Sequence, residues 1–217
     1  DNEQFLKKLE ELNQDDGVDG ILMFRPLPKQ LDEEAATRLL AVEKDIDGNT
    51  QGSLAGIYAN TGDGFAPCTA EAVMAILNYY GIEMAGKKAV VIGRSLVIGR
   101  PVAMLLMHKQ ATVTICHSRS KKIDKISRKA DILVAAAGQM QSIDRNYIKE
   151  GQIVIDVGIH WDEKAQKLCG DVVTNDVEEV VAAVTPVPGG VGAVTTSILA
   201  KHVLEAAIKR RGIADEI

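Results

Sequence analysis

The length, composition and charge of the sequence favour a globular α/β protein that binds a small molecule. The chain has 217 residues, and 46% of them are hydrophobic, which is enough to bury a sizeable core. The formal net charge of −5 argues against a nucleic-acid partner, because phosphate backbones are held by clustered Lys and Arg. The three cysteines form no CxxC or Cys/His pattern, so we expect reduced thiols, no metal site and a cytoplasmic location.

The start of the chain and its apolar runs give two further expectations. There is no signal peptide, and no apolar run approaches the roughly 18 residues of a membrane span, so we expect no membrane partner. The chain begins with Asp1 instead of Met, directly in a predicted helix. We therefore expect that an N-terminal part of the natural protein precedes it.

The first part of the chain predicts a small unit with helices and a strand. Apolar residues at helical spacing predict a helix from Gln4 to Leu12. VDGILMF, residues 18–24, predicts a short buried strand that stops at the prolines of RPLP. Residues 32–42 are helical again. Residues 43–68 are turn-rich and contain five glycines, and loops of this length are usually functional or disordered.

A helix and four apolar segments follow. Thr69 is a good N-cap for a helix that continues to Tyr80, and Gly81 stands where a C′ glycine belongs. The apolar segments alternate with helical or turn segments, and they are KAVVIG (88–93), TVTIC (112–116), DILVAAAG (131–138) and IVIDVGI (153–159). Such strands are buried on both faces, as in a doubly wound parallel sheet. A last helix is predicted from about Ser197 to Arg210.

The stretch VVIGRSLVIGRP, residues 90–101, predicts a loop that binds a dinucleotide phosphate. A pyrophosphate binds where a strand stops, a glycine lets the backbone approach, and the free amides of the next helix face the anion. Gly93 supplies the turn, Ser95 a hydroxyl donor and Gly99 close packing, while Pro101 fits the first helical turn. The glycines are further apart than in GxGxxG. By spacing alone, an ordinary strand-to-helix turn without a ligand remains the alternative.

The end of the second predicted strand favours NADP over NAD. A carboxylate at this position binds the ribose hydroxyls of NAD, whereas an Arg accommodates the 2′-phosphate of NADP. The strand ends in CHSRSKK, which contains Ser118 and Arg119 and no carboxylate. Arg94 could add a second bidentate contact to the same phosphate. The alternative is a solvated basic surface made of Arg94, Arg119, Lys121 and Lys122.

Several motifs together resemble the methylenetetrahydrofolate dehydrogenase/cyclohydrolase family. They are GRSLVIGRP, ATVTICHSRS, ADILVAAAG, VIDVGI and TPVPGGVG, with RPLP, EKDIDG and PCT upstream. The resemblance covers essentially the whole chain in order. It implies a subunit, usually a homodimer, that oxidises 5,10-methylenetetrahydrofolate with NADP and hydrolyses the methenyl product to 10-formyltetrahydrofolate. These reactions would serve one-carbon metabolism and purine biosynthesis.

The resemblance and the order of the predicted elements give an α/β protein with two domains. Residues 1–66 and 187–217 would form a smaller α/β domain for the folate substrate, incomplete at its N-terminus. Residues 67–186 would form the Rossmann-like NADP-binding domain, with the cleft between the two domains.

The resemblance also assigns site residues. The cofactor would contact Gly93, Arg94, Ser95, Ser118 and Ile159, with Ile159 near the nicotinamide and Thr195 close to the reacting ring. Arg119 is added to the cofactor contacts by the CHSRSKK stretch, as a partner of the 2′-phosphate. The folate would contact Met23, Phe24, Arg25, Asp47, Pro188, Gly189, Gly190 and Gly192. Asp47 also makes physical sense by itself, because one carboxylate can accept the adjacent N–H donors at the edge of a pterin. The alternative for Asp47 is a turn residue that bonds its own backbone.

Two departures from the family affect the hydrolysis step. The family uses a Tyr and a Lys in its opening segment, which has no counterpart here, so the 217-residue chain alone is not expected to catalyse normally. Phe24 stands where the family has a catalytic Gln, and Arg25 stands where a Leu is common. Because Phe cannot hydrogen-bond a lysine or a water, we expect dehydrogenase activity to survive better than cyclohydrolase activity.

Other interpretations stay open. The chain could be a dinucleotide-binding or dimerisation module with impaired catalysis, which Phe24 favours. It could also be a different two-domain dehydrogenase, which PVPGGVG and EKDIDG together disfavour. Cys68 is expected to pack at the domain junction, because no basic partner is evident to activate it. His202 is expected at a surface or a domain junction, and His160 could approach the nicotinamide.

Overall fold

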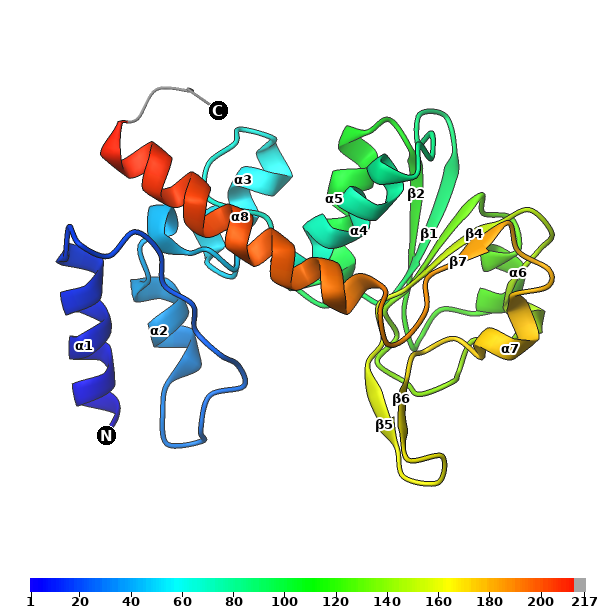
Figure 1. Cartoon of the computed structure of the whole chain (residues 1–217), viewed down its shortest axis with the longest axis horizontal. Helices are drawn as coiled ribbons and strands as arrows, with labels where there is room; N and C mark the ends of the chain where they lie inside the picture. Colours follow the sequence, from blue (N-terminus) through cyan, green and yellow to red (C-terminus); the bar gives the residue numbers. More distant parts are fainter. Residues whose placement is uncertain (213–217) are drawn as a thin grey trace. The chain divides into compact units, whose positions relative to one another are not determined.

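A computed structural model describes residues 1–212, and the chain divides into two compact units (Figure 1). The first unit comprises Asp1–Cys68 and the chain from Ser197 onward, and the second comprises Thr69–Thr196. The first boundary lies close to the residue 66 expected from the sequence. The second lies after Thr196 instead of after residue 186. Residues 187–196 therefore belong to the same unit as the predicted nucleotide-binding sheet.

The second unit is built on a five-stranded parallel sheet, which confirms the predicted α/β fold class (Figure 1). In spatial order the strands are β2 (Thr112–Cys116), β1 (Lys88–Ile92), β3 (Ile132–Ala135), β4 (Ile153–Asp156) and β7 (Ala183–Val184). The central strands β1, β3 and β4 are almost fully buried, whereas the edge strand β2 is mostly exposed. This difference explains why the central strands read as continuous apolar runs.

The sheet places the carboxyl ends of its strands at one edge, because all its pairings are parallel. In register, Val90 of β1 lies beside Leu133 of β3, and Leu133 lies beside Val154 of β4. The strand order reverses between β1 and β3, and ligands of open α/β sheets bind outside the carboxyl ends at such a point. β3 and β4 end earlier than predicted, so the last residues of those apolar segments are loops at this edge.

Helices and a hairpin complete the second unit. They are α4 (Cys68–Tyr79), α5 (Gly99–His108), α6 (Ile123–Ser127), η2 (Arg145–Tyr147) and α7 (Thr174–Val177), with the antiparallel pair β5 (His160–Asp162) and β6 (Lys167–Cys169). Figure 1 shows α4 and α5 on one side of the sheet and α6 on the other. The sequence did not predict β5, β6 or β7, because strands of two or three residues are too short for a pattern.

The first unit is mostly helical in the residues described. It contains α1 (Asn2–Gln14), α2 (Glu33–Leu39), η1 (Val42–Lys44), α3 (Gln51–Ala59) and most of α8 (Val191–Arg211). The predicted strand over residues 18–24 is wrong. Within the described part of the unit, the β pairing of this segment is a single bridge between Ile21 and Asp45. Its apolar side chains pack against α1 and α2 without the continuous partner strand that a ladder needs.

The predicted loop over residues 43–68 contains the unpredicted helix α3. The Thr50 Oγ1 atom caps this helix by accepting from the Ser53 N–H at 3.1 Å, and Asn60 ends it with a φ of 56°. Gly56 lies where a Cβ atom would overlap the Asp63 carbonyl oxygen. Gly56, one of the glycines that made this segment resemble a loop, is therefore needed for close packing of the helix.

Helix α8 corrects two expectations. It begins at Val191 instead of near Ser197. It is also long and apolar enough to cross a membrane by length and composition, with a mean hydropathy of 1.3 in its most apolar window. One such helix is weak support for a membrane protein. In the first unit α8 buries one face at helical spacing, with Ile198, His202 and Ala206.

Cys68 and His202 form a buried contact that the sequence did not predict. Each is 1% exposed, and the Cys68 Sγ atom lies 3.5 Å from the His202 Nδ1 atom. Both groups also approach the Ile46 carbonyl oxygen, at 3.3 Å from Sγ and 2.9 Å from Nδ1. A carbonyl only accepts, so the thiol and the ring N–H both donate to it. The pair satisfies a buried backbone group, and His202 lies in the interior instead of at the surface, one of the two positions expected for it.

Lys44 holds the end of α1 with a fully buried ammonium group. Its Nζ atom donates to the carbonyl oxygens of Leu12, Asn13 and Asp15 at 2.9, 2.6 and 2.8 Å. These carbonyls belong to the last turn of α1 and the residue that follows it, where helix carbonyls lack backbone partners and a positive charge is favourable. Lys44 therefore connects η1 to α1.

We predict that Lys44→Met destabilises the first unit by about 3 kcal/mol, because the carbonyls lose their only buried charged donor. Hydrogen exchange of the α1 amides measures this loss as faster exchange. Lys8→Met is the matched control, because Lys8 is exposed on α1 and pairs with the exposed Glu11 of the same helix. Equal exchange in both variants would contradict the role of Lys44.

Candidate functional site

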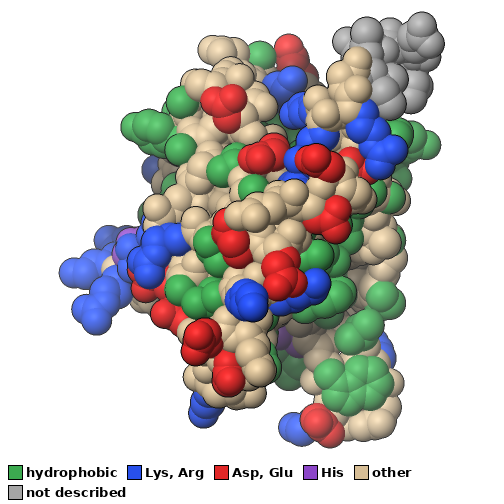
Figure 2. Space-filling model, turned by 90° about the vertical axis from the view of Figure 1, so that its left-hand side faces the viewer, with side chains coloured by type: hydrophobic (Ala, Val, Ile, Leu, Met, Phe, Trp, Pro, Cys, Tyr) green, Lys and Arg blue, Asp and Glu red, His purple; other side chains and the backbone are tan. Residues whose placement is uncertain are grey.

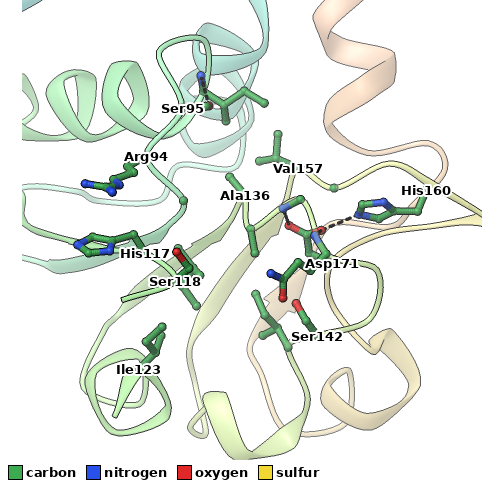
Figure 3. A pocket seen from close by; sticks show the side chains of 18 of the residues that line it. Arg94, Ser95, His117, Ser118, Ile123, Ala136, Ser142, Val157, His160 and Asp171 are labelled. Carbon is green, nitrogen blue, oxygen red and sulfur yellow. Dashed lines mark hydrogen bonds and ion pairs between the residues drawn. The ribbon is translucent and has the colours of Figure 1, made fainter. Parts of the chain in front are cut away.

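A cavity of about 670 Å³ lies at the carboxyl edge of the parallel sheet (Figure 3). Four loops that each follow a strand supply much of its lining, with Gly93, Arg94 and Ser95 after β1, His117 and Ser118 after β2, Ala136–Gln139 after β3 and Val157–His160 after β4. Cavities of this size hold small ligands and cofactors. The position and the size both fit the nucleotide site predicted from the sequence.

Gly93 allows the loops after β1 and β3 to approach each other closely. Its φ is 130°, and a Cβ atom at this position would overlap the Ala136 carbonyl oxygen. A side chain is therefore excluded both by backbone conformation and by space. The turn that the sequence predicted is present, and Gly93 and Ala136 both line the cavity there.

Ser95 changes the expected role of the start of α5. Its Oγ atom accepts from the N–H groups of Ile98 and Gly99 at 3.1 and 3.4 Å, and its carbonyl accepts from the Arg100 N–H at 3.1 Å. Pro101 has no N–H. The first amides of α5 are already paired, so the expectation of free helix amides facing the anion is wrong for this structure. The Ser95 hydroxyl hydrogen remains to donate to a phosphate.

Donor side chains gather on one side of the cavity. Figure 3 shows Arg94, His117 and Ser118 there. The His117 Nδ1 atom accepts from the Arg119 N–H at 3.2 Å, which leaves its Nε2 atom as the N–H donor. Arg119 itself is exposed and does not line the cavity. Inside the cavity, the hydrogen-bond donors near the end of β2 are therefore the His117 imidazole and, from the loop after β1, the Arg94 guanidinium.

Asp171 links two loops on the other side of the cavity (Figure 3). Its carboxylate is fully buried and accepts from the N–H groups of Gly138 and Gln139, both at 3.0 Å. The His160 Nε2 atom lies 2.7 Å from Asp171 Oδ1. The loop after β3 and the start of β5 are thus tied to one carboxylate.

Asp156 accepts a hydrogen bond from the backbone of Asp171 and from two other N–H groups. It is 1% exposed, and it accepts from the N–H groups of Gly158, Asp171 and Val172 at 2.9, 3.0 and 2.9 Å. Burial raises the pKa of the Asp156 carboxyl, while the three backbone donors act in the opposite direction. Its hydrogen bonds fix the loop after β4 and the segment after β6, so they fix the base of the cavity.

A second cavity adjoins the first at Ile159. It has a volume of about 340 Å³, and it is lined by Ile159, Leu168 and residues 186–193, which include Pro188, Gly189, Gly190 and Gly192. Ile159 is 60% exposed and lines both cavities. Thr195 lines neither, and its Oγ1 atom donates to the Val191 carbonyl inside α8. The structure thus brings the predicted folate residues 188–192 next to Ile159 in the second unit.

The other predicted folate residues lie in the first unit. Met23 and Phe24 line an apolar cavity of about 240 Å³ beside α1, and Phe24 is 83% exposed. Arg25 and Asp47 are joined through the side chain of Asn49.

Asp45, and not Asp47, is the residue that hydrogen-bonds the backbone of this turn. Asp45 accepts from the N–H groups of Asn49 and Thr50 at 3.1 and 2.7 Å, and from the Ser53 hydroxyl at 2.7 Å. Among residues 1–212, Asp47 accepts only from the Asn49 side chain, at 2.6 Å. Its carboxylate therefore keeps capacity for a ligand.

Several cavity residues were not predicted as cofactor contacts. They are His117, Ala136–Gln139, Ser142, Tyr147 and Asp171. Those that directly follow a strand could have been found from the rule that ligands bind beyond the carboxyl ends. Tyr147 and Asp171 carry no local signal, because only the folded chain brings them to this edge. In the described part of the chain, no group of three or more His, Cys, Asp or Glu could hold a metal ion.

Comparisons with known proteins decide the family. The sequence model described as "Tetrahydrofolate dehydrogenase/cyclohydrolase, NAD(P)-binding domain" matches residues 67–211, and the one for the catalytic domain matches residues 1–47. The chain belongs to the tetrahydrofolate dehydrogenase/cyclohydrolase family. The match to the NAD(P)-binding domain includes every residue of the 670 Å³ cavity.

Relatives and solved structures agree with this membership. The bifunctional protein FolD of Carboxydothermus hydrogenoformans is 51% identical over 207 residues, which are 95% of this chain and 72% of that protein. The crystal structure of the bifunctional enzyme FolD, a methylenetetrahydrofolate dehydrogenase/cyclohydrolase, from Campylobacter jejuni has a TM-score of 0.93 and 37% identity, covering 96% of this chain and 74% of that one. FolD of Trypanosoma brucei, solved with NADP cofactor and an inhibitor, has a TM-score of 0.89 and 37% identity. The match covers 99% of this chain and 74% of that one.

We predict that Gly93→Ala weakens dinucleotide binding at least about tenfold, because the new methyl group must push the loop after β3 into the cavity. Fluorescence titration with NADPH measures the affinity. Gly86→Ala is the matched control, because Gly86 also has a positive φ, of 71°, but has no atom within 4 Å of the new methyl group. Equal losses of NADPH affinity in the two variants would assign the effect to backbone strain. They would contradict a specific effect of the overlap between a Cβ atom at Gly93 and the Ala136 carbonyl oxygen.

Proposed function

We propose that the protein oxidises 5,10-methylenetetrahydrofolate to 5,10-methenyltetrahydrofolate with NADP. Its membership of the family and its 51% identity to a bifunctional FolD protein support this reaction. The observation that carries the cofactor assignment is the cavity at the carboxyl edge, where donor side chains and no carboxylate follow β2. Gly93 lines this cavity, and a Cβ atom there would overlap the Ala136 carbonyl oxygen, so glycine keeps the loops after β1 and β3 close together at the cavity.

The residues of the second unit would bind and orient the cofactor. NADP, when bound, supplies the hydride acceptor. The Ser95 hydroxyl and the Arg94 guanidinium can donate to phosphate oxygens, and the His117 Nε2–H and Ser118 can do the same at the end of β2. Ile159 offers an exposed apolar surface between the two cavities, where a flat ring can pack. Positioning of this kind is the main requirement of hydride transfer.

Each unit offers candidate folate contacts of its own, which are Asp47 in the first unit and residues 188–192 in the second. Asp47 has a free carboxylate oxygen among the described residues, and a pterin presents adjacent N–H donors to such a group. Residues 188–192 line the cavity that shares Ile159 with the cofactor cavity. A substrate ring in that cavity would lie next to the proposed nicotinamide position.

We predict that Ser118→Asp lowers kcat/KM for NADP at least about tenfold relative to NAD, because a carboxylate repels the 2′-phosphate and accepts ribose hydroxyls. Initial rates with methylenetetrahydrofolate and each cofactor measure the ratio. Ser118→Asn is the matched control, because it adds the same shape without a charge. Equal losses with the two cofactors would place Ser118 away from the 2′-phosphate.

The hydrolysis step is the part of the family's activity that the residues of this chain support least. Phe24 is exposed and apolar, and it can neither accept nor donate a hydrogen bond. Hydrolysis of the methenyl product requires a directed water and a proton relay. We therefore propose that dehydrogenase activity exceeds cyclohydrolase activity in this protein.

We predict that Phe24→Gln raises the cyclohydrolase rate about tenfold or more, because an amide can orient a water or a lysine. Dehydrogenase activity should stay within about twofold, since the substitution adds nothing at the hydride-transfer centre. The decay of methenyl absorbance in the natural protein and the variant measures the change, with Phe24→Leu as the apolar control. Natural protein that hydrolyses the methenyl compound as fast as Phe24→Gln would contradict the role of Phe24.

We also propose a cytoplasmic homodimer that serves one-carbon metabolism and purine biosynthesis, with no nucleic-acid or membrane partner. Trp161 and Leu168 support a dimer, because this cross-strand pair on the β5–β6 hairpin is exposed. In the described residues Cys68, Cys116 and Cys169 form no disulfide, as is usual in a reducing compartment. Acidic and basic side chains are interspersed over much of the face in Figure 2, which supports the proposal that nucleic acid is not a partner, because nucleic acid is held by clustered Lys and Arg. A monomer in sedimentation equilibrium, or recovery with membranes, would contradict these proposals.

A further inference from the structure

A short chain of hydrogen bonds in the first unit connects Arg25 to Asp47. The Arg25 Nη2 atom donates to Asn49 Oδ1 at 2.6 Å, and the Asn49 Nδ2 atom donates to Asp47 Oδ2 at 2.6 Å. A guanidinium only donates and a carboxylate only accepts, so the Asn49 amide has one orientation that satisfies both neighbours. Asn49 therefore transmits the position of a permanent cation to the candidate pterin-binding carboxylate.

The middle of this chain and its Arg25 end are both anchored. Asn49 is 9% exposed, and its backbone N–H donates to the buried Asp45 at 3.1 Å. The Arg25 Nη1 atom pairs with Glu33 Oε1 at 3.3 Å, and Glu33 Oε2 accepts from the Leu27 N–H at 3.0 Å. The guanidinium thus joins the loop after residue 24 to the first turn of α2 and to the turn that carries Asp47.

Asp47 keeps acceptor capacity that this arrangement orients. Its side chain is partly exposed, and among residues 1–212 its Oδ1 atom accepts no hydrogen bond. One lone pair of Oδ2 also remains beside the bond from Asn49. A carboxylate held at one oxygen loses less rotational freedom when a ligand binds, so pre-orientation increases affinity.

We propose that Arg25 is a positioning residue for the folate, and that it acts through Asn49 on the carboxylate of Asp47. The inference rests on the proposed function, in which Asp47 accepts the N–H donors of a pterin. Without Arg25, the buried Asn49 Oδ1 atom loses its charge-assisted donor. The Asn49 amide is then no longer fixed, and Asp47 loses the partner that orients it.

The test is equilibrium binding of 5-formyltetrahydrofolate, a reduced folate that the dehydrogenase step cannot oxidise, measured by calorimetry on the natural protein and its variants. Arg25→Leu and Asn49→Ala should each weaken binding about tenfold, the size expected for a hydrogen bond to a charged group. The double variant should bind no more weakly than the weaker single variant, because both substitutions break the same chain. Arg25→Lys keeps a charged donor for Asn49 and should recover most of the affinity.

Two further variants control for charge and folding. Lys29→Leu removes an exposed cation from the same loop without touching the network, and its binding should stay within about twofold of the natural protein. Asn49→Asp breaks the bond to Asp47 without leaving a cavity and should weaken binding as Asn49→Ala does. It replaces that variant if Asn49→Ala does not fold. Additive losses in the double variant would show that Arg25 contacts the ligand itself and would overturn the inference, as would unchanged binding in Arg25→Leu.

Asp47→Asn separates this inference from the proposed function. If that variant binds 5-formyltetrahydrofolate normally, Asp47 is not the pterin acceptor and the role of Arg25 is overturned, while NADP-dependent oxidation of methylenetetrahydrofolate still stands. If the protein fails to carry out that oxidation but its folate binding depends on Arg25 through Asn49, the positioning role holds and the proposed reaction fails.

Discussion

Two buried carboxylates at the carboxyl edge of the parallel sheet determine the shape of the nucleotide cavity. Asp156 and Asp171 together accept from five backbone N–H groups, which belong to the loops after β3 and β4 and the segment after β6. Buried backbone donors need partners, and buried carboxylates need donors, so each group offsets the desolvation cost of the other. The loops that would carry the cofactor are therefore held in place before any ligand arrives.

The first unit depends on the same principle with other residues. Lys44 donates to carbonyl oxygens at the end of α1, Asp45 accepts from the Thr50 N–H at the start of α3, and Arg25 connects the loop after residue 24 to α2. Each is a charged side chain that hydrogen-bonds or ion-pairs groups outside its own turn. The candidate folate carboxylate Asp47 accepts from Asn49, which is held in turn by Arg25 and Asp45.

The sequence predicted those features whose residues lie in one short segment, and it missed those that depend on contacts between segments. The four apolar strands and the turn at Gly93 were predicted because each lies in one short segment. Helix α3 was missed because its glycines resemble a loop, and the strand over residues 18–24 was wrong because its apolar side chains pack without a partner strand. Asp171 pairs with an amide 33 residues away, a distance at which a single sequence holds no signal.

The central claim is that this chain belongs to an enzyme that transfers hydride from methylenetetrahydrofolate to NADP. The most direct measurement follows NADPH and methenyl absorbance together, with the natural protein, methylenetetrahydrofolate and NADP. We predict one methenyl product for each NADPH, and no reaction when either substrate is omitted. Folded protein that binds NADPH in a separate titration but forms neither product would contradict it, and would leave a dinucleotide-binding module without catalysis.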